Sequence, residues 1–397
     1  MPRWDVNFNL RLDSQRPQIV SLKERAYALA SVIRAIPIPP YTKTKLDALN
    51  ILRAVRGTTG IEGIELTEDE VRQIMESPPK KSVLPPNRSR EEKEARNAEE
   101  LMYYVAEEVN RNPNLPLTEK LVCKIHEITT KGIDYPDNIP GKYRTHPVSA
   151  GNFIPPSGED VRKLMREFIK WFNTGVPIAW DSIIRAIVAH FYVVSIHPFG
   201  DGNGRTARGV ESFLLYQGGV NARGFYSLAN YYYQHRHEYV QFLDQVRFQS
   251  NGDLTPFILF ALQGLVLELE AVHNEVLSDV KLIAFRDYAR EQLVVHGKLG
   301  TRVGERMLRF LLALSEQSVS LKALRNGDHR LARFYRKLTT KTLSRDLNFL
   351  KQHELVIIDG NELRANLDIM TRYTPPYELS GRRRPQHRTI TQRSRGR

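Results

Sequence analysis

The residues best equipped for chemistry fall within one segment, IHPFGDGNGRTAR, which runs from Ile196 to Arg208. His197 can accept a proton near neutral pH, and Asp201 offers the hard oxygen ligand that a phosphate-bound Mg²⁺ prefers. Arg205 and Arg208 are three residues apart, so on one helix both side chains can reach the same phosphate chain. A base, a metal ligand and two cations this close together are the equipment for in-line attack on a phosphate of a nucleoside triphosphate.

The glycines of the same segment predict how the backbone completes this site. The apolar pattern over 181–196 predicts a buried helix, which should end at His197 because a proline follows it. Gly200, Gly202 and Gly204 then permit turns that other residues resist, and a second helix begins near Gly204. A tight loop that leads into a helix N-terminus points backbone N–H groups into one concavity, so we expect an anion cradle there.

The elements that must position this loop are helices. Apolar residues recur at helical spacing through the first 300 residues, and no strong strand pattern appears before residue 140. Thr67 followed by Glu70 resembles a capping box, and Thr118 is placed to cap another helix. We therefore expect a mainly α fold, with helices at 42–55, 67–75, 90–109, 119–130, 159–172, 181–196, 205–216, 234–248 and 255–285.

The pattern changes after Gly300. Helical periodicity at 302–314, 320–324 and 339–353 is followed by two short strands on either side of a turn at Gly360 and Asn361. Three helices followed by a hairpin is the order of a winged helix-turn-helix domain. The final residues, 371–397, lack apolar periodicity, so we expect them to be disordered.

The charge of the chain is concentrated in this C-terminal quarter. Of the formal net charge of +13, residues 301–370 contribute thirteen Lys/Arg against eight Asp/Glu, and 371–397 contribute eight Arg against one Glu. An acidic partner is expected there, and Lys341, Arg345 and Lys351 would make 339–353 a DNA recognition helix. A winged-helix module that docks protein is the alternative.

Composition limits the other function classes. The longest apolar stretch, Phe257 to Leu267, is too short to span a bilayer, and the N-terminal residues lack the apolar core of a signal peptide. The single cysteine, Cys123, fits a reducing compartment and a buried, unreactive thiol, so we expect a cytoplasmic protein without a membrane partner. No GxxxxGK[ST] segment is present, which disfavours a P-loop enzyme.

The segment from His197 to Arg208 resembles the signature of the Fic family, His-x-Phe-x-Asp/Glu-Gly-Asn-Gly-Arg-x-x-Arg, with every fixed position present. The resemblance covers roughly residues 40–260 and implies a Fic-type helical core that acts as a protein adenylyltransferase. Such an enzyme moves AMP from ATP, with Mg²⁺, onto a Ser, Thr or Tyr hydroxyl of a target protein or of itself. The roles it implies are a base (His197), a metal ligand (Asp201), a cradle for the α- and β-phosphates (Gly202, Asn203 and Gly204), ligands of the outer phosphates (Arg205 and Arg208) and a core anchor (Phe199).

Three further segments resemble parts of the same family. The stretch from Gly57 to Gly63 is similar to an inhibitory helix, which implies that Glu62 pairs with Arg208 and blocks productive ATP binding. A β-hairpin flap that docks the target is implied for Val148, Ser149, Ala150, Gly151, Asn152, Phe153 and Ile154; an ordinary surface hairpin is the alternative. Tyr239 stands where many relatives have two tyrosines near the adenine.

The predicted organisation has five parts. These are an N-terminal helical region with the inhibitory motif (1–115), a Fic catalytic core (116–260), a connecting helix (261–300), a winged-helix-like domain (301–370) and a basic tail (371–397). Removal of AMP with the help of Glu62, transfer of another phosphate-bearing group, and a nucleotide-sensing DNA-binding regulator remain as alternative functions. Gly204 argues against phosphorylation, because relatives that phosphorylate carry lysine there. A homodimer is left open.

Overall fold

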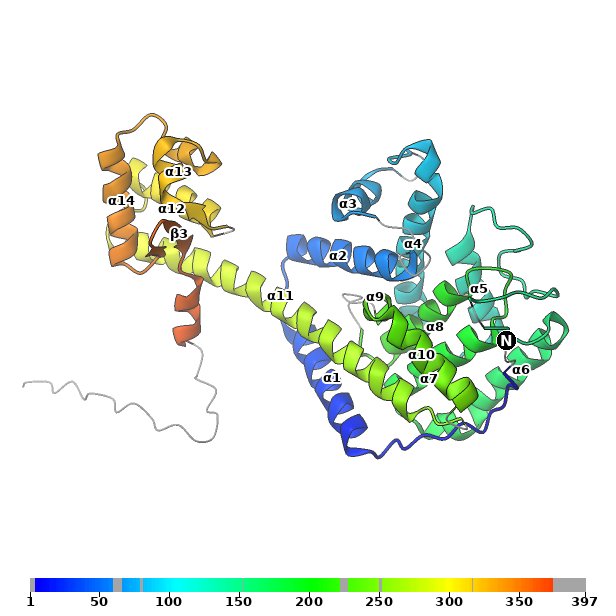
Figure 1. Ribbon diagram of the computed structural model, residues 1–397. Helices are drawn as coiled ribbons and strands as arrows, with labels where there is room; N and C mark the ends of the chain where they lie inside the picture. Colours follow the sequence, from blue (N-terminus) through cyan, green and yellow to red (C-terminus); the bar gives the residue numbers. More distant parts are fainter. Residues whose placement is uncertain are drawn as a thin grey trace, which may run out of the picture. The chain divides into compact units, whose positions relative to one another are not determined.

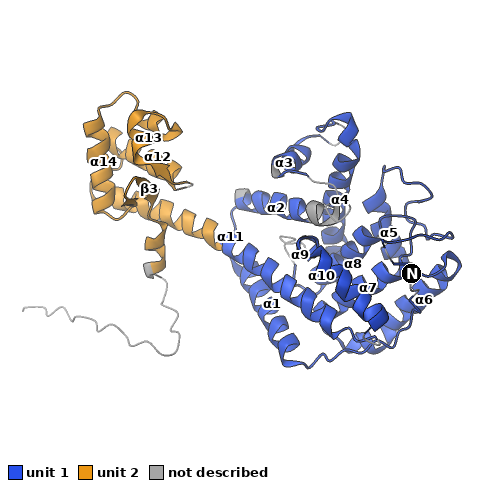
Figure 2. Ribbon diagram, viewed as in Figure 1, with its two compact units in different colours: residues 1–276 blue, residues 277–397 orange. Residues whose placement is uncertain are grey.

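The computed structural model describes residues 4–59, 66–78, 81–151, 153–221, 228–249, 252–315 and 317–373. It divides into two compact units, Met1–Val276 and Leu277–Arg397, coloured blue and orange in Figure 2. The described chain is mainly helical, as the sequence predicts. The division between the units falls within 261–300, the range that the sequence assigns to a connecting helix.

Unit 1 is built mainly from helices, with one long irregular segment at 131–157 between α5 and α6 (Figure 1). Most of the predicted helices are present within two or three residues of their expected ends. The described helices are α1 (Pro17–Ala35), α2 (Pro40–Thr59), α3 (Glu68–Glu76), α4 (Ser89–Arg111), α5 (Glu119–Thr130), α6 (Gly158–Thr174), α7 (Ser182–Ile196), α8 (Asn203–Gln217), α9 (Leu228–Gln234), α10 (Arg236–Asp244), the π-helix η4 (Gln245–Gln249), the short 3-10 helices η2 (Pro86–Arg88) and η3 (Val176–Ala179), and α11 (Thr255–Val295), which continues into unit 2.

The centre of unit 1 is α7. Asp181 caps its N-terminus by accepting a hydrogen bond from the backbone N–H of Ile183 at 2.9 Å. From Ile183 onward every residue of α7 except Arg185 is buried, so the helix is enclosed on all sides. It packs along α8, and the loop between these two helices is the segment expected to carry chemistry. The core therefore fixes both ends of that loop.

Capping signals in the sequence are confirmed. Thr67 accepts from the backbone N–H of Glu70, whose side chain accepts from the backbone N–H of Thr67, which completes the predicted capping box. Thr118 caps α5 by accepting from the backbone N–H of Leu121 at 3.1 Å. The sequence did not predict α1, because two of the four residues on its buried face are alanines, which give little apolar contrast: Ile19, Ala26, Ala30 and Ile33.

Unit 2 contains helices α12 (Arg302–Leu314), α13 (Leu321–Asn326) and α14 (Thr340–Gln352), and strands β1 (Val319–Ser320), β2 (Val356–Asp359) and β3 (Glu362–Ala365). The strands form one antiparallel sheet in the order β1-β3-β2. Its core also takes in three residues near the end of α11: Phe285, Ala289 and Leu293. β1 was not predicted, since two residues are too few to show alternation.

The long helix α11 extends well beyond the apolar stretch that the sequence shows. Within the described residues it is the one helix whose length and composition would allow it to cross a membrane. However, 67% of its most apolar window is buried inside the fold, and the core helix of a globular protein passes the same test. Its residues Phe257, Leu262 and Leu265 are fully buried, which favours a core helix.

The flap expected at 148–154 differs from its prediction. Instead of two paired strands, the described residues there form a single antiparallel bridge between Ala150 and Phe153, with backbone hydrogen bonds of 3.0 Å in both directions. Gly151 turns the chain at φ +59°. Pro147, Pro155 and Pro156 flank the turn, and prolines cannot donate to a strand ladder, so the hairpin does not extend.

Candidate functional site

The loop between α7 and α8 depends on two left-handed residues. His197 ends α7 at φ 54° and ψ 58°, while its N–H still donates to the carbonyl of Val193 at 3.0 Å. Gly202 precedes α8 at φ 72°, and a Cβ there would lie 2.6 Å from Cγ2 of Thr130. Glycine is therefore required at 202 by both backbone conformation and space. The left-handed conformation of His197 is unfavourable for a residue with a side chain, and hydrogen bonds to its backbone from Arg144 and to Val193 hold it in place.

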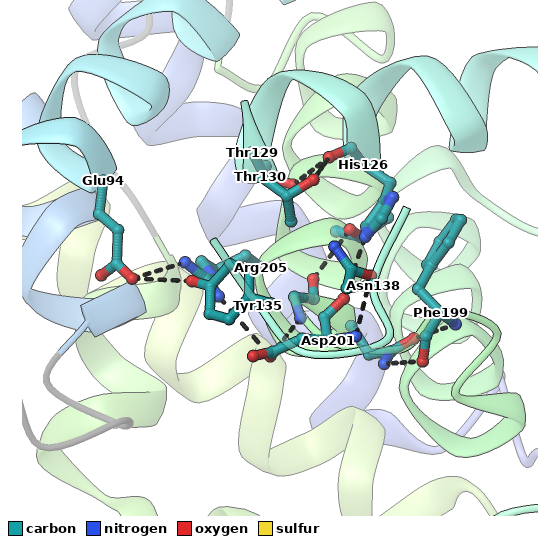
Figure 3. A network of polar contacts seen from close by, with 12 residues as sticks. Glu94, His126, Thr129, Thr130, Tyr135, Asn138, Phe199, Asp201 and Arg205 are labelled. Atoms are coloured by element: carbon teal, nitrogen blue, oxygen red, sulfur yellow. Dashed lines mark hydrogen bonds and ion pairs between the residues drawn. The ribbon is translucent and has the colours of Figure 1, made fainter. Parts of the chain in front are cut away.

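Residues from outside the loop hold its backbone in place (Figure 3). His126 donates from Nε2 to the carbonyl of Asp201 at 3.0 Å and accepts at Nδ1 from the N–H of Gly141 at 2.9 Å. Its ring also stacks on Phe199, with centroids 3.7 Å apart. Asn138 accepts from the N–H of Asp201 at 3.0 Å. His126 is thus a packed, hydrogen-bonded residue that positions the loop.

Asn203 closes the loop on itself. Its side-chain oxygen accepts from the N–H of Phe199 at 2.8 Å, and its amide nitrogen donates to the carbonyl of Phe199 at 2.9 Å. Gly202, at the N-cap of α8, has no side chain with which to cap the helix, and its own N–H donates to Oδ1 of Asp201 at 2.5 Å. The positive end of the helix dipole is therefore directed at the space before α8, which is the arrangement that binds phosphate.

His197 is prepared to act as a base. Its Nδ1 lies 3.1 Å from the carbonyl oxygen of Val194, and because a carbonyl only accepts, Nδ1 carries the proton and Nε2 remains the acceptor. Burial lowers the pKa of His197 to about 4, and the positive charges of Arg144 and Arg247 act in the same direction. The imidazole is therefore neutral at physiological pH.

Arg144 connects His197 to the flap. This buried side chain donates to three carbonyls, those of His197 at 2.8 Å, His146 at 2.9 Å and Pro156 at 2.7 Å. Its backbone N–H donates to the carbonyl of Pro198 at 2.9 Å. One arginine thus fixes the backbone of the base and both ends of the flap.

Arg247, in η4, makes a second connection between the same elements. Nε donates to the buried hydroxyl of Ser195 in α7 at 3.0 Å, and Nη1 donates to Asp244 at 3.2 Å. Its guanidinium also lies 4.0 Å from the centroid of the Phe153 ring in the flap. Burial lowers the pKa of Arg247 to about 10, so it stays positively charged at neutral pH beside His197.

A cavity of about 990 Å³ opens between the loop, the flap and α10. That volume is at the upper end of the range for small-molecule sites. It brings together predicted site residues from distant parts of the chain with others that the sequence did not single out. The lining residues are Ala150, Gly151, Phe153, Val194, His197, Asp201, Asn203, Gly204, Arg236, His237, Tyr239, Val240, Leu243, Asp244 and Arg247.

Asp201 fits the role of a magnesium ligand. It lines the cavity with its side chain 40% exposed, while its backbone is held from both sides by His126 and Asn138. A phosphate-bound Mg²⁺ needs only one or two carboxylates, because phosphate oxygens and water complete its coordination. Among the described residues no cluster of three or more His, Cys, Asp or Glu is arranged to hold a metal by itself.

Arg205 and Arg208 line a separate, smaller cavity of about 80 Å³ together with Glu94. Nη1 of Arg205 lies 2.9 Å from Glu94, and Nη2 lies 3.8 Å from Asp201, so this buried side chain spans the two carboxylates (Figure 3). The side chain of Arg208 folds back along α8 toward its N-terminus, since a Cβ on Gly204 would lie 3.1 Å from its Nη1. Both arginines are within one helical turn of the cradle.

Tyr239 lies at the base of the larger cavity. Its hydroxyl is 2.9 Å from Nε2 of His190, and its ring stacks on Tyr232 at 4.8 Å. Burial raises the pKa of Tyr239 to about 12, so the phenol is neutral. Nδ1 of His190 lies 3.5 Å from Glu211, which also accepts from the Tyr232 hydroxyl at 2.8 Å. The ring of Tyr239 can face a ligand while its hydroxyl is held by the core.

The remaining predicted site residues are placed as follows. Ala150, Gly151 and Phe153 line the cavity, whereas Val148, Ser149 and Ile154 do not appear among its lining residues. Gly202 is not a lining residue either; it shapes the turn. Glu62 and Asn152 lie outside the described residues.

Three residues with clear roles in the geometry were missed by sequence reasoning. The sequence pattern assigned no role to Arg144, Glu94 or Arg247. Each acts through contacts with residues far away along the chain, such as Arg205 for Glu94 and Ser195 for Arg247. No local spacing reveals such contacts, although the buried position of a charged residue on a helix's apolar face is a weak signal.

Comparison with known proteins agrees with this geometry. Residues 116–215 match the Fic/DOC family model. The chain is 31% identical over 251 residues to a protein adenylyltransferase Fic from Aedes aegypti, a match that covers 63% of this chain and 44% of the relative. It is 30% identical over 204 residues to a protein adenylyltransferase Fic from Nematostella vectensis, covering 51% and 44%. This chain thus spans less than half the length of the curated relatives it matches.

A solved structure extends the likeness in fold. A Fic family protein from Desulfovibrio desulfuricans G20 superimposes with a TM-score of 0.51 at 18% identity, covering 92% of this chain and 98% of that one. At this identity the likeness concerns the fold alone. The family match, the full signature from His197 to Arg208 and the helix–loop–helix that presents it converge on one conclusion: residues 116–215 of this chain form a domain of the Fic/DOC family.

Proposed function

We propose that this chain is a protein adenylyltransferase, which transfers AMP from ATP to a Ser, Thr or Tyr hydroxyl of a target protein or of itself. The hydroxyl oxygen attacks the α-phosphorus and forms a new O–P bond. The bond between the α-phosphorus and the bridging oxygen breaks, and pyrophosphate leaves. Nε2 of His197 takes the hydroxyl proton. The names of the relatives from Aedes aegypti and Nematostella vectensis support this reaction class.

The strongest support for this proposal is that His197 and the start of α8 line the same cavity. A neutral His197, with its proton fixed on Nδ1 by Val194, lines the same cavity as the start of α8. An attacking hydroxyl needs a base, and a bound phosphate is stabilised by the N-terminus of a helix. Because Pro198 and Asn203 fix the loop between them, both can act on one substrate without rearrangement.

Mg²⁺ would be held by Asp201. When bound, the ion neutralises phosphate charge and helps pyrophosphate to leave. The chain's own residues do the remaining work: the first turn of α8 binds the α- and β-phosphates, and Arg205 and Arg208 attract the outer phosphates. The ring of Tyr239, which lines the cavity, would contact the adenine of ATP. The flap residues Ala150 and Phe153 would offer backbone groups to an extended target segment.

The reaction class is tested by the position of a label. The protein is incubated with Mg²⁺ and ATP labelled at either the α- or the γ-phosphate, and the washed protein is counted. AMP transfer places the α-label on protein and leaves the γ-label in solution as pyrophosphate. Transfer of the γ-label instead would make the chain a kinase and overturn the proposal.

We further propose that Glu62 inhibits the forward reaction by pairing with Arg208. A carboxylate held against that arginine in a partly dry site competes with the γ-phosphate for a charge-assisted pair. Glu62→Gly should therefore raise auto-modification about tenfold for each 1.4 kcal/mol of lost competition. Arg208→Ala should lower auto-modification with or without Glu62, because it removes the partner itself.

The same variant separates the reverse reaction from the forward one. If Glu62 positions a water that removes AMP, Glu62→Gly loses the ability to strip AMP from a pre-modified protein. Equal auto-modification by wild type and Glu62→Gly at saturating ATP and Mg²⁺ would contradict the inhibitory role.

A further inference from the structure

The exposed face of α14 in unit 2 is polar, and none of its residues lines the cavity that contains His197. Four residues of this helix are buried against the unit's core: Leu343, Asp346, Leu347 and Leu350. The opposite face is exposed, and α14 itself lies at the edge of the unit (Figure 1). It forms a shallow surface lined by Thr340, Lys341, Ser344, Arg345, Asn348, Phe349 and Gln352. We refer to these seven residues as the α14 face.

The α14 face is positive because its helix has turned its one carboxylate inward. Asp346 is the only acidic residue of α14, and its side chain is 1% exposed. Arg306 in α12 pairs with it, with Nη2 and Nε 2.7 Å and 3.0 Å from Oδ2. Lys341 and Arg345 are exposed, and the side chain of Arg345 is 69% exposed. Nε of Arg345 lies 3.8 Å from Oδ1 of Asp346, but that single carboxylate is buried and also pairs with Arg306. The exposed surface of the helix therefore carries positive charge and no exposed acid.

The residues around the α14 face are also mainly positively charged. Residues 321–352 contain nine Lys/Arg and two Asp. Arg333, Arg336 and Lys337, just before α14, are all exposed. A positive helix flanked at its N-terminus by further cations matches a polyanion that continues past the helix end, which a phosphate backbone does.

The residue types on the α14 face favour DNA as the ligand over an acidic protein surface. Arg345, Asn348 and Gln352 lie on one side of the helix, and these are the residue types that bind guanine or adenine edges with two hydrogen bonds. The core of a protein interface is instead apolar and aromatic. The α14 face has one aromatic residue, Phe349, and it is half-buried against the unit's own core.

The order of elements also suits a helix that enters a groove. In unit 2, α12, β1, α13 and α14 are followed by the β2–β3 hairpin. This is the order of a winged helix-turn-helix, in which the helix before the hairpin reads the major groove. The hairpin tip carries Asp359 and Glu362, both exposed, so it would repel phosphate. The helix, and not the hairpin, is thus the contact surface.

We propose that unit 2 binds duplex DNA by placing the α14 face in the major groove, a function separate from AMP transfer. Lys341, with Arg333, Arg336 and Lys337, contacts phosphates, while Arg345, Asn348 and Gln352 face the base edges. The class of ligand is B-form duplex DNA, and the sequence it prefers is set by the last three side chains.

The test compares two double variants of the full chain that change net charge equally. Lys341→Glu/Arg345→Glu alters the α14 face. Arg162→Glu/Arg166→Glu alters an exposed pair at the same spacing on α6 in unit 1, far from it in the sequence. Binding of a fluorescein-labelled random-sequence duplex is followed by anisotropy over a series of salt concentrations. Thermal melting and transfer of α-labelled AMP report that each variant is folded.

The proposal expects the wild type and the α6 variant to bind alike, with affinity that falls as salt rises, and the α14 variant to lose about tenfold or more. Equal loss in both variants would mean that net charge alone matters. Unchanged binding by the α14 variant would place the DNA contact elsewhere, for example at 371–397. Absence of binding by wild type at low salt, or displacement of DNA by polyglutamate at equal charge concentration, would also overturn it.

Discussion

At the scale of single residues, the candidate site consists of ordinary side chains placed in unusual surroundings. His197 is held neutral by burial and by two arginines, and Arg205 spans two carboxylates. The sequence predicted His197 and Asp201 because their types and spacing show directly what they can do. Arg144 and Arg247 could not be predicted in the same way, because their roles come from carbonyls, a hydroxyl and a ring brought together only by folding.

The lowered pKa of His197 predicts the pH dependence of transfer. A base works when deprotonated, so the rate should be lost as pH falls through the pKa of His197, about 4, rather than through the ordinary value. The rate constant at saturating ATP should therefore stay level from neutral pH down to about pH 5. Arg247→Met, which removes one of the positive charges, should shift the acid limb upward. A wild-type limb at about 6.5 would show that His197 is not desolvated as described.

At the scale of elements, most helices were predictable, whereas α1 and the form of the flap were not. Helical periodicity and the caps at Thr67 and Thr118 gave α3 and α5 to within a residue or two. The flap was expected to be a hairpin, but among its described residues only Ala150 and Phe153 pair. The flap is held by Arg144 and Arg247, which contact it from other parts of the chain. Neither local strand propensity nor the alternation of polar and apolar residues could therefore predict its position.

The loop before α8 supplies a prediction about glycine. Gly202→Ala adds a Cβ at φ +72° and 2.6 Å from Cγ2 of Thr130, whereas Gly132→Ala adds one at φ +67° with nothing within 4 Å. Both variants bear left-handed strain of about 1 kcal/mol, and only Gly202→Ala adds a clash. We expect a larger loss of stability in chemical denaturation, and a loss of transfer, for Gly202→Ala alone.

A second change tests the cause of that loss. Thr130→Ser removes Cγ2 but keeps the hydroxyl, which donates a hydrogen bond to the backbone carbonyl of His126 at 2.8 Å. Gly202→Ala/Thr130→Ser should therefore recover part of the lost stability and activity. If Gly202→Ala and Gly132→Ala cost the same, or if serine restores nothing, the space at Gly202 is not what restricts it to glycine.

At the scale of the whole molecule, the division into two units predicts where the chain can be shortened. Phe285, Ala289 and Leu293 of α11 belong to the core of unit 2. A chain that ends at Gly300 keeps these apolar side chains but loses the partners that cover them, so it should aggregate. A chain that ends at Val276 lacks these apolar side chains as well as the partners that cover them. It should stay monodisperse in size-exclusion chromatography and keep AMP transfer. Loss of transfer by a folded 1–276 chain would show that unit 2 is needed for catalysis.

The most direct test of the account is intact-mass spectrometry after incubation with ATP and Mg²⁺. Glu62→Gly should gain the mass of AMP, and wild type should gain it more slowly. His197→Ala, made in the Glu62→Gly background, should still bind ATP in calorimetry but lose about 100-fold or more in the rate of that gain. A missing AMP adduct in Glu62→Gly at saturating ATP, or His197→Ala retaining more than about a tenth of the rate, would contradict the assignment of His197 as the base of an adenylyltransferase.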